Sequence, residues 1–343
     1  MQVLQQTLDS GKPFPFPDGL LINGNRDSSV FTGQGGKTYM FRVSNIGLTS
    51  SINFRIQSHT LKLIEVEGSH TIQVEYDSMD IHVGQSMAFL VTLNGQTKDY
   101  YVVASTHFTR MVLSSTAILR YAGSCIHASV PLPPPPTYQY HGWNLTANAA
   151  RPNPQGSFHY GEINVTRTLI LANSAANING KLRYAVNSIS YTNPDTPLKL
   201  ADYFNISGVF TLNTILDKPS SRPAVLGTSV FGITLHDFDE IIFQNKEKTM
   251  QAWHLDGHAF WTVGFGANQW SPAMRSRYNK VDAVARYTVQ VYPNTWSAIL
   301  VSLDNKGMWN LRSSIWPSQY LGQQLYLKSM EQQAEPIYRI QHS

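Results

Sequence analysis

Apolar and polar residues alternate along much of this 343-residue chain, as they do in half-buried β-strands. The alternation is clear at residues 39–43, 52–56 and 72–76. Mostly apolar runs at 87–93 and 100–104 are typical of strands buried on both faces. Asn-Gly and Gly-Gly pairs separate these segments, and no convincing helical stretch lies between them. The pattern predicts an all-β fold of sandwich or barrel type.

A Pro-rich segment at 130–137 interrupts the pattern with five prolines. Proline fixes φ and removes a backbone donor, so an extended polyproline conformation is expected. A ligand for an SH3-type domain is one interpretation, but folded-looking sequence on both sides favours a stiff interdomain linker. The predicted domains are therefore 1–129 and 138–343.

The strand pattern resumes after the linker. Charges cluster and the period is lost at 274–282, which predicts a surface excursion. The polar tail from Lys328 onward is expected to fray or to wrap around the fold. The further predicted strands cover 169–171, 224–231, 240–244, 259–264, 287–292 and 298–303.

The charge balance changes the picture little, because 26 basic and 22 acidic residues give a formal net charge of only +4. No run of Lys and Arg with interleaved aromatic residues occurs, so nucleic-acid binding is not expected. Weak attraction to an anionic matrix such as a polyuronate is an alternative to a merely solvated basic surface. No stretch reaches 18 apolar residues, so no transmembrane segment is predicted.

The cysteine content and the glycosylation sequons point to different cellular compartments. The chain has one cysteine, Cys125, so no internal disulfide can form, which taken alone favours a reducing compartment. Asn144, Asn164 and Asn205 each begin a glycosylation sequon, which functions only in the secretory pathway. The first residues have no basic and apolar regions typical of a signal peptide.

Three local clusters are candidates for chemistry, and each has a structural interpretation that we favour. His254 and His258 are four residues apart, but Gly257 intervenes, so structural histidines are favoured over a shared metal site. The carboxylates of residues 236–240 are expected in a solvated loop rather than as an acid–base pair. Cys125, near His127, is expected to pack as a small hydrophobe rather than to act as a catalytic thiol.

Two segments of the second half carry a family resemblance. The first reads QAWHLDGHAFWTVG at 251–264, and the second reads GMWNLRSSIWPSQYLGQ at 307–323. In the first half, PDGLLING at 17–24 and DIHVGQ at 80–85 agree with them. The chain resembles the multicopper oxidases related to ascorbate oxidase, specifically the plant pollen-specific and skewed-growth-type branch. The resemblance implies two cupredoxin-like Greek-key domains, the second and third of that family.

The resemblance also implies where copper ligands would lie. The family pattern is H-P-x-H-L-H followed by H-C-H-x-x-x-H-x-x-x-x-M. A blue-copper site needs a thiolate, two imidazoles and usually a weak axial methionine. On this chain the four positions are occupied by other residues: Gln251, Ser313, Ser318 and Gln323.

The positions implied for the trinuclear copper cluster are His254, Asp256, Arg312 and Ser314, of which only His254 is an imidazole. Arginine stays protonated and is not a metal ligand, so we expect Arg312 to pair with Asp256 in place of copper. The remaining ligands of the family belong to a first domain with H-x-H pairs, and this chain has no such pair.

These substitutions predict a non-catalytic protein without catalytic, metal or cofactor-binding residues, in which binding or scaffolding has replaced oxidation. The resemblance implies a glycosylated plant protein of the cell wall, cell surface or pollen apoplast, with an unknown wall or surface ligand and a role in cell expansion or tube growth. The alternatives are a copper-dependent oxidoreductase of the ascorbate oxidase or laccase type, with copper as cofactor, and a truncated gene product. Absence of the first domain would expose an apolar face and favour self-association.

Overall fold

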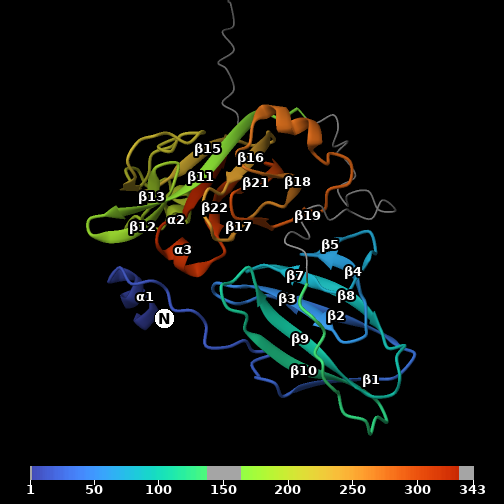
Figure 1. Ribbon diagram of the computed structural model, residues 1–343. Coiled ribbons are helices and arrows are strands. Elements are labelled where there is room, and N and C mark those ends of the chain that lie inside the picture. Colours follow the sequence, from blue (N-terminus) through green and yellow to red (C-terminus); the bar gives the residue numbers. More distant parts are fainter. Residues whose placement is uncertain (1, 137–163, 332–343) are drawn as a thin grey trace, which may run out of the picture.

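The computed structural model describes residues 2–136 and 164–331, and it confirms the all-β prediction (Figure 1). The strands form four sheets, two within each half of the chain. In each half the apolar faces of the two sheets pack against each other, because alternation places every second side chain inside. Figure 1 shows the two resulting units one above the other, with the second half of the chain at the top.

The first unit contains two small sheets around one core. One sheet has the order β1 (Ser29–Gly33), β10 (Ser114–Tyr121), β9 (Asp99–His107), β3 (Ser51–Ile56) and β7 (Met79–Ile81). The other has the order β2 (Thr38–Ser44), β8 (Ser86–Thr92), β4 (Leu61–Val66) and β5 (Ser69–His70), with β6 (Glu75–Tyr76) paired to β4.

The second unit contains an eight-stranded and a five-stranded sheet. The larger has the order β14 (Val225–Gly227), β13 (Ile189–Tyr191), β12 (Lys181–Val186), β11 (Arg167–Ile178), β16 (Phe238–Gln244), β21 (Thr295–Ser302), β18 (Phe260–Ala267) and β19 (Ala285–Arg286). The smaller has the order β15 (Val230–Thr234), β23 (Gln324–Met330), β22 (Gly307–Ser313), β17 (Gln251–Leu255) and β20 (Thr288–Val291). Short helices connect strands or precede them: α1 (Gln2–Asp9), α2 (Leu198–Tyr203), the 3₁₀ helix η1 (Pro272–Arg277) and α3 (Trp316–Tyr320).

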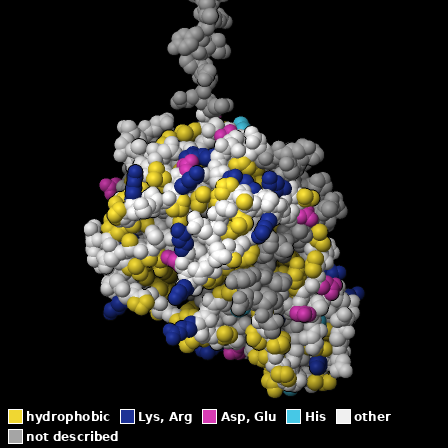
Figure 2. Space-filling model, turned by 45° about the horizontal axis from the view of Figure 1, so that its top comes forward, with side chains coloured by type: hydrophobic (Ala, Val, Ile, Leu, Met, Phe, Trp, Pro, Cys, Tyr) yellow, Lys and Arg dark blue, Asp and Glu magenta, His cyan; other side chains and the backbone are white. Residues whose placement is uncertain are grey.

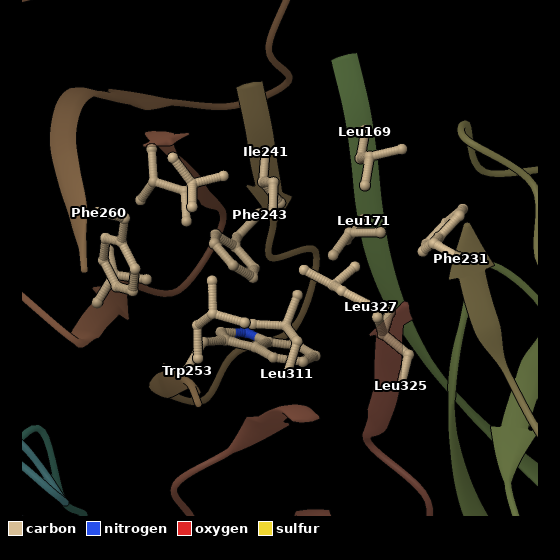
Figure 3. Packing of buried hydrophobic residues seen from close by; sticks show 14 of the residues in the cluster. Leu169, Leu171, Phe231, Ile241, Phe243, Trp253, Phe260, Leu311, Leu325 and Leu327 are labelled. Carbon is tan, nitrogen blue, oxygen red and sulfur yellow. The ribbon is translucent and has the colours of Figure 1, made fainter. Parts of the chain in front are cut away.

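The core of the second unit lies between its two sheets (Figure 3). Phe243 on β16 and Trp253 on β17 meet there, with ring centroids 5.2 Å apart. Leu311 on β22 and Leu325 on β23 are fully buried beside them. Burial of such side chains contributes about 1.5–3 kcal/mol each, so this core holds β17 and β22 firmly in place.

Three sequence-based expectations about strands and helices are wrong. The alternation at 72–76 yields only β6, and Ile72 and Val74 are exposed. The predicted strand at 224–231 is split into β14 and β15, which belong to different sheets. The short helices were not expected, because helices of five to eight residues carry too little periodicity to be detected.

The expected surface excursion at 274–282 contains the end of η1. The polar tail, in contrast, does not begin at Lys328. Residues 328–330 complete β23, which pairs with both β15 and β22, and Ser329 is fully buried. Burial alternates along β23, so Gln324 and Lys328 lie on its less buried face and Ser329 lies on its buried face.

Part of the Pro-rich segment lies along the first unit. Residues 130–136 form no strand, and Gln57 Nε2, next to the end of β3, donates hydrogen bonds to the carbonyl oxygens of Ser129 and Pro131. Arg55 Nε on β3 donates to the Pro133 oxygen at 2.9 Å. Proline carbonyls remain available as acceptors although the residue has no donor, so this segment can be anchored to the first unit by side chains.

The two units meet along a polar and apolar seam. Glu67, in the turn after β4, accepts the backbone N–H of Tyr287 and of Thr288 at 2.6 and 2.9 Å. Gln85 Nε2 donates to Gln290 Oε1 at 3.2 Å, and Val284 packs into the core of the first unit. The seam therefore fixes β20 against the first unit.

The visible surface is sparsely charged. Figure 2 shows basic side chains spread over the upper part of that face, with fewer acidic ones, rather than in one dense patch. No helix in the described ranges is long and apolar enough to cross a membrane.

Candidate functional site

The positions at which the resemblance places copper ligands lie on or beside β17 and β22. Pairing of these antiparallel strands sets His254 opposite Arg312, and Trp253 opposite Ser313. Asp256 directly follows β17, and its backbone N–H donates to the Asn310 oxygen on β22 at 2.9 Å. The structure thus brings together residues that are more than fifty positions apart in sequence.

Arg312 and Asp256 form the ion pair expected from the sequence, with Nη1 and Oδ1 2.7 Å apart. His254 Nε2 lies 3.4 Å from the same oxygen, and Lys199 Nζ lies 3.9 Å from Oδ2. The side chains of Arg312, Asp256 and His254 are each about a quarter exposed, so the group lies at an open face. Three nitrogen-bearing side chains surround one carboxylate.

This surrounding keeps Asp256 ionised. Burial alone would raise the pKa of Asp256, but hydrogen bonds from His254 and Arg312, together with the positive charge of Arg312, outweigh it and lower the pKa to about 2. Arg312 Nη1 also donates to Asn310 Oδ1 at 3.3 Å. The guanidinium is therefore fixed between two oxygen acceptors on the face where a metal cluster would need imidazoles.

Two of the implied blue-copper positions, Gln251 and Ser313, have buried side chains that are hydrogen-bonded to their surroundings. Gln251 Nε2 donates to Asn245 Oδ1 at 3.0 Å, and Gln251 Oε1 accepts from Trp253 Nε1 at 3.1 Å. Ser313 Oγ accepts the N–H of Ile315 at 3.2 Å. These side chains have taken up structural hydrogen bonds in place of a metal.

Backbone hydrogen bonds hold the other two blue-copper positions near Ser313. The N–H of Ser313 donates to the Gln323 oxygen at 3.0 Å, and the N–H of Gln323 donates to the Ser318 oxygen at 2.9 Å. Helix α3 closes this loop between β22 and β23, so its short length keeps Ser318 close to Gln323. The backbone therefore brings these three positions together in one loop.

Gln323 is expected to be a weak point of the fold. Its side chain is 2% exposed, and Nε2 has no hydrogen-bond partner within 2–136 and 164–331. A buried donor without a partner costs about 1–3 kcal/mol, so Gln323→Met should raise the free energy of unfolding by about 1 kcal/mol. Urea unfolding followed by tryptophan fluorescence measures this change.

Gln251→Met is the matched control, because it changes the same side chain at a position where both polar ends are hydrogen-bonded. It should destabilise the protein, since it leaves Asn245 and Trp253 without these partners. Equal effects of the two substitutions would contradict the assignment of an unsatisfied amide at Gln323.

His258 and Cys125, two other candidates from the sequence, differ in burial. His258 is buried, as expected for a structural histidine: Nδ1 lies 3.2 Å from the Ser302 carbonyl oxygen, and burial lowers the pKa of the ring. Cys125 is exposed, so its expected packing as a small hydrophobe is wrong. Its neighbours after β10 form an exposed turn, which gives the thiol nothing to pack against.

The carboxylates at 239 and 240 are not in a solvated loop, which corrects the sequence-based expectation. Both lie in β16, and both residues are at most 2% exposed. Glu240 Oε2 accepts from Arg275 Nη2 at 2.5 Å, whereas burial raises the pKa of Asp239 to about 6. Arg275 belongs to η1, and a partner so far along the chain leaves no local signal in the sequence.

Sequence reasoning also missed Lys199 and Asn310, which complete the surroundings of Asp256 and Arg312. Asn310 could have been found, because it lies two residues before Arg312 on a strand and so shares its face. Lys199 comes from α2, and only the fold brings it to this site.

Comparison with known proteins identifies the scaffold. Residues 1–124 and residues 195–335 match two family models, both described as multicopper oxidase. The chain belongs to the multicopper oxidase family. It is 49% identical to an L-ascorbate oxidase homolog from Brassica napus over 341 residues, and 43% identical to the monocopper oxidase-like protein SKU5 from Arabidopsis thaliana over 355. The expected family and its plant branch are confirmed.

The chain spans about three-fifths of the length of these relatives: 61% of the Brassica protein and 60% of the Arabidopsis protein, with 94% and 95% of this chain aligned. Among solved structures, the multicopper oxidase Fet3p matches with a TM-score of 0.75 and 21% identity, covering 92% of this chain and 60% of that one. A laccase from Botrytis aclada matches with a TM-score of 0.73 and 20% identity, over 95% and 61%. The two sandwiches are therefore cupredoxin-like domains.

The residues at this multicopper oxidase site do not suit copper. A blue-copper ion requires a thiolate and two imidazoles, whereas the chain offers two amides and two hydroxyls. At the cluster positions one imidazole remains, beside a guanidinium that carries no lone pair for a metal. Among the described residues, no group of three or more His, Cys, Asp or Glu is placed to hold a metal ion.

Proposed function

We propose that this chain is a non-catalytic member of the multicopper oxidase family that acts by binding or scaffolding at the plant cell surface or wall. The observation that carries the proposal is the Arg312–Asp256 ion pair at the positions of the trinuclear cluster. Arg312 lies on β22, and Asp256 directly follows β17. The register of these two paired strands brings the two side chains together, so the ion pair follows from the fold.

The electrostatics of the pair support loss of copper. Arg312 carries a permanent positive charge, and two like charges about 4 Å apart repel by about 4 kcal/mol at the effective dielectric near a protein surface. A copper ion at the same place would meet this repulsion and lose Asp256 as a ligand to the guanidinium. The site therefore favours arginine over metal.

The blue-copper positions support the same proposal independently. Gln251 and Ser313 are buried and engaged in structural hydrogen bonds, and neither offers a soft donor. A chain that has lost both the electron-accepting copper and the cluster has no route for oxidising a substrate.

Copper analysis of the full chain tests the proposal. After incubation with Cu(II) and with Cu(I) under reducing conditions, followed by desalting, we expect less than about 0.1 copper per chain by elemental analysis, with no blue absorption. About one or more tightly held coppers per chain with a blue band would establish the alternative, a copper-dependent oxidoreductase, and overturn this proposal.

Export and glycosylation belong to the same proposal. Asn164 and Asn205 are exposed and accessible for modification, whereas Asn144 lies outside the described residues. Secretion from a eukaryotic host should yield a protein whose mass falls on treatment with an N-glycosidase. An unchanged mass of the secreted protein would contradict glycosylation at these sites.

Self-association of the chain stays a prediction, which light scattering of the purified protein tests.

A further inference from the structure

A cavity of about 420 Å³ lies between β12, the end of β13 and helix α3. This volume is within the range of small-molecule sites, about 300–1,000 Å³. None of the implied copper-ligand positions lines the cavity, so its chemistry is separate from theirs. Its lining consists of Lys181, Arg183, Tyr191, Thr192, Asn193, Trp316, Gln319, Tyr320 and Gln324.

One wall of the cavity is aromatic. Trp316 and Tyr320 are four residues apart on α3, and their rings stack with centroids 5.4 Å apart and an interplanar angle of 22°. Both side chains are partly exposed rather than absorbed into a core. Aromatic rings combine a large apolar surface with a polar edge, which suits the C–H face of a sugar ring beside its hydroxyls.

The charges in the cavity lining are all positive. Lys181 and Arg183 alternate on β12 and so share a face, and no acidic residue lines the cavity. Arg183 Nε is buried and has no hydrogen-bond partner in the part of the chain that the structure describes. Because Nε is buried while the residue is partly exposed, a ligand carboxylate would meet the terminal nitrogens of the guanidinium, which can donate two parallel hydrogen bonds to it.

The chain itself shows that this rim accepts a carboxylate. Asp9, at the end of α1, forms an ion pair with Lys181, and Tyr320 Oη donates to both of its carboxylate oxygens at 3.0 Å. The Lys181 hydrogen bond holds the pKa of Asp9 below its ordinary value. Asp9 forms its ion pair with Lys181 and is also attracted by the more distant charge of Arg183, whereas Arg183 forms no ion pair within the described residues and can receive a ligand carboxylate.

We propose that this cavity binds a uronic-acid-containing oligosaccharide, with its carboxylate on Arg183 and a sugar face against Trp316 and Tyr320. The Gln319 amide, which also lines the cavity, supplies a donor and an acceptor for ring hydroxyls, whereas the Gln324 amide is engaged by Asn310 and the Gln319 backbone oxygen. The inference rests on the proposed function as a binding protein and names the substrate class that it would recognise.

Titration calorimetry of the full chain with a galacturonic acid trimer tests the site, with a neutral galactose trimer as the matched ligand. We expect the acidic trimer to bind at least about tenfold more tightly than the neutral one, because charge-assisted bidentate hydrogen bonds are the strong ones. Equal affinities, or no heat with the acidic trimer at about 10 mM, would overturn the proposal.

Variants locate the binding. Arg183→Gln should weaken binding at least about tenfold, whereas Lys37→Gln, an equal loss of charge at an exposed turn of the first unit, should leave it unchanged. Equal losses in the two variants would indicate non-specific attraction of a polyanion and sink the proposal. Asp9→Asn leaves the cavity lining intact and frees Lys181, so it should strengthen binding, and weaker binding would count against the site.

Copper measured on the same samples separates this inference from the proposed function. A chain that holds copper and still binds the trimer contradicts only the non-catalytic assignment. A copper-free chain that does not bind the trimer contradicts only the proposal that this cavity binds a uronic-acid-containing oligosaccharide.

Discussion

Glu67→Ala is expected to lower the apparent free energy of unfolding by about 3–5 kcal/mol, because it removes a carboxylate that attracts the buried guanidinium of Arg286 and accepts two backbone N–H groups of the other domain. Arg286 is fully buried, and although burial lowers the pKa of its guanidinium to about 10, it stays charged at neutral pH. Its attraction to Glu67 offsets part of that burial. The substitution also takes away the acceptor of two backbone N–H groups at Tyr287 and Thr288.

Urea unfolding followed by tryptophan fluorescence measures the effect, with Glu75→Ala as control. Glu75 is exposed, and its contacts are the ion pair with Lys62 at 3.4 Å and a hydrogen bond accepted from Thr60 at 3.1 Å, both at the surface, so its loss should change stability by less than about 1 kcal/mol. Glu67→Gln keeps an oxygen acceptor and removes only the charge, which separates the two contributions. If Glu67→Ala cost no more than Glu75→Ala, the seam would not depend on this carboxylate.

The partner can be removed as well. Combining Glu67→Gln with Arg286→Met should restore much of the lost stability, because replacing both members of a buried pair by groups of similar shape is often nearly neutral. A double-mutant cycle gives the coupling between the two side chains directly. Additive effects would mean that Arg286 is compensated by other neighbours.

The alternation of apolar and polar residues predicted individual strands, but it did not predict which sheet each strand joins. Residues 52–56 alternate between apolar and polar side chains and form β3 as predicted, although Asn53 and Arg55 on the polar face of the strand are buried as well. The segment at 224–231 was misread, because its residues indicate extended structure but not which of two sheets each of them joins. The chain passes from the larger sheet to the smaller between Gly227 and Val230.

The candidate site divides in a similar way. Asp256 and Arg312 carry opposite charges at positions that the family pattern places together, so their pairing was predictable. The burial of the Glu240 carboxylate was not predictable, because the ion pair that stabilises this charge is formed with Arg275, in a helix of another segment. Partners supplied by tertiary contacts leave no trace in the sequence around the residue that needs them.

Restoring four ligands should convert this chain into a blue-copper protein. Gln251→His, Ser313→Cys, Ser318→His and Gln323→Met together supply the thiolate, the two imidazoles and the axial thioether. Hydrogen bonds along the backbone still hold Ser313, Gln323 and Ser318 in one loop, and β17 still pairs with β22 beside them. We expect copper content to rise to about one per chain, with an intense blue absorption.

The same variant with Ser313 retained is the control, because without the thiolate it should show no blue band even if it binds copper. Neither variant should reduce dioxygen, since Arg312 and Asp256 remain paired at the cluster positions. A four-ligand variant that folds but stays colourless after copper loading would show that the scaffold has drifted along with its ligands. A blue variant would show the opposite: that the backbone of this chain can still position a blue-copper ion once the four side chains are supplied.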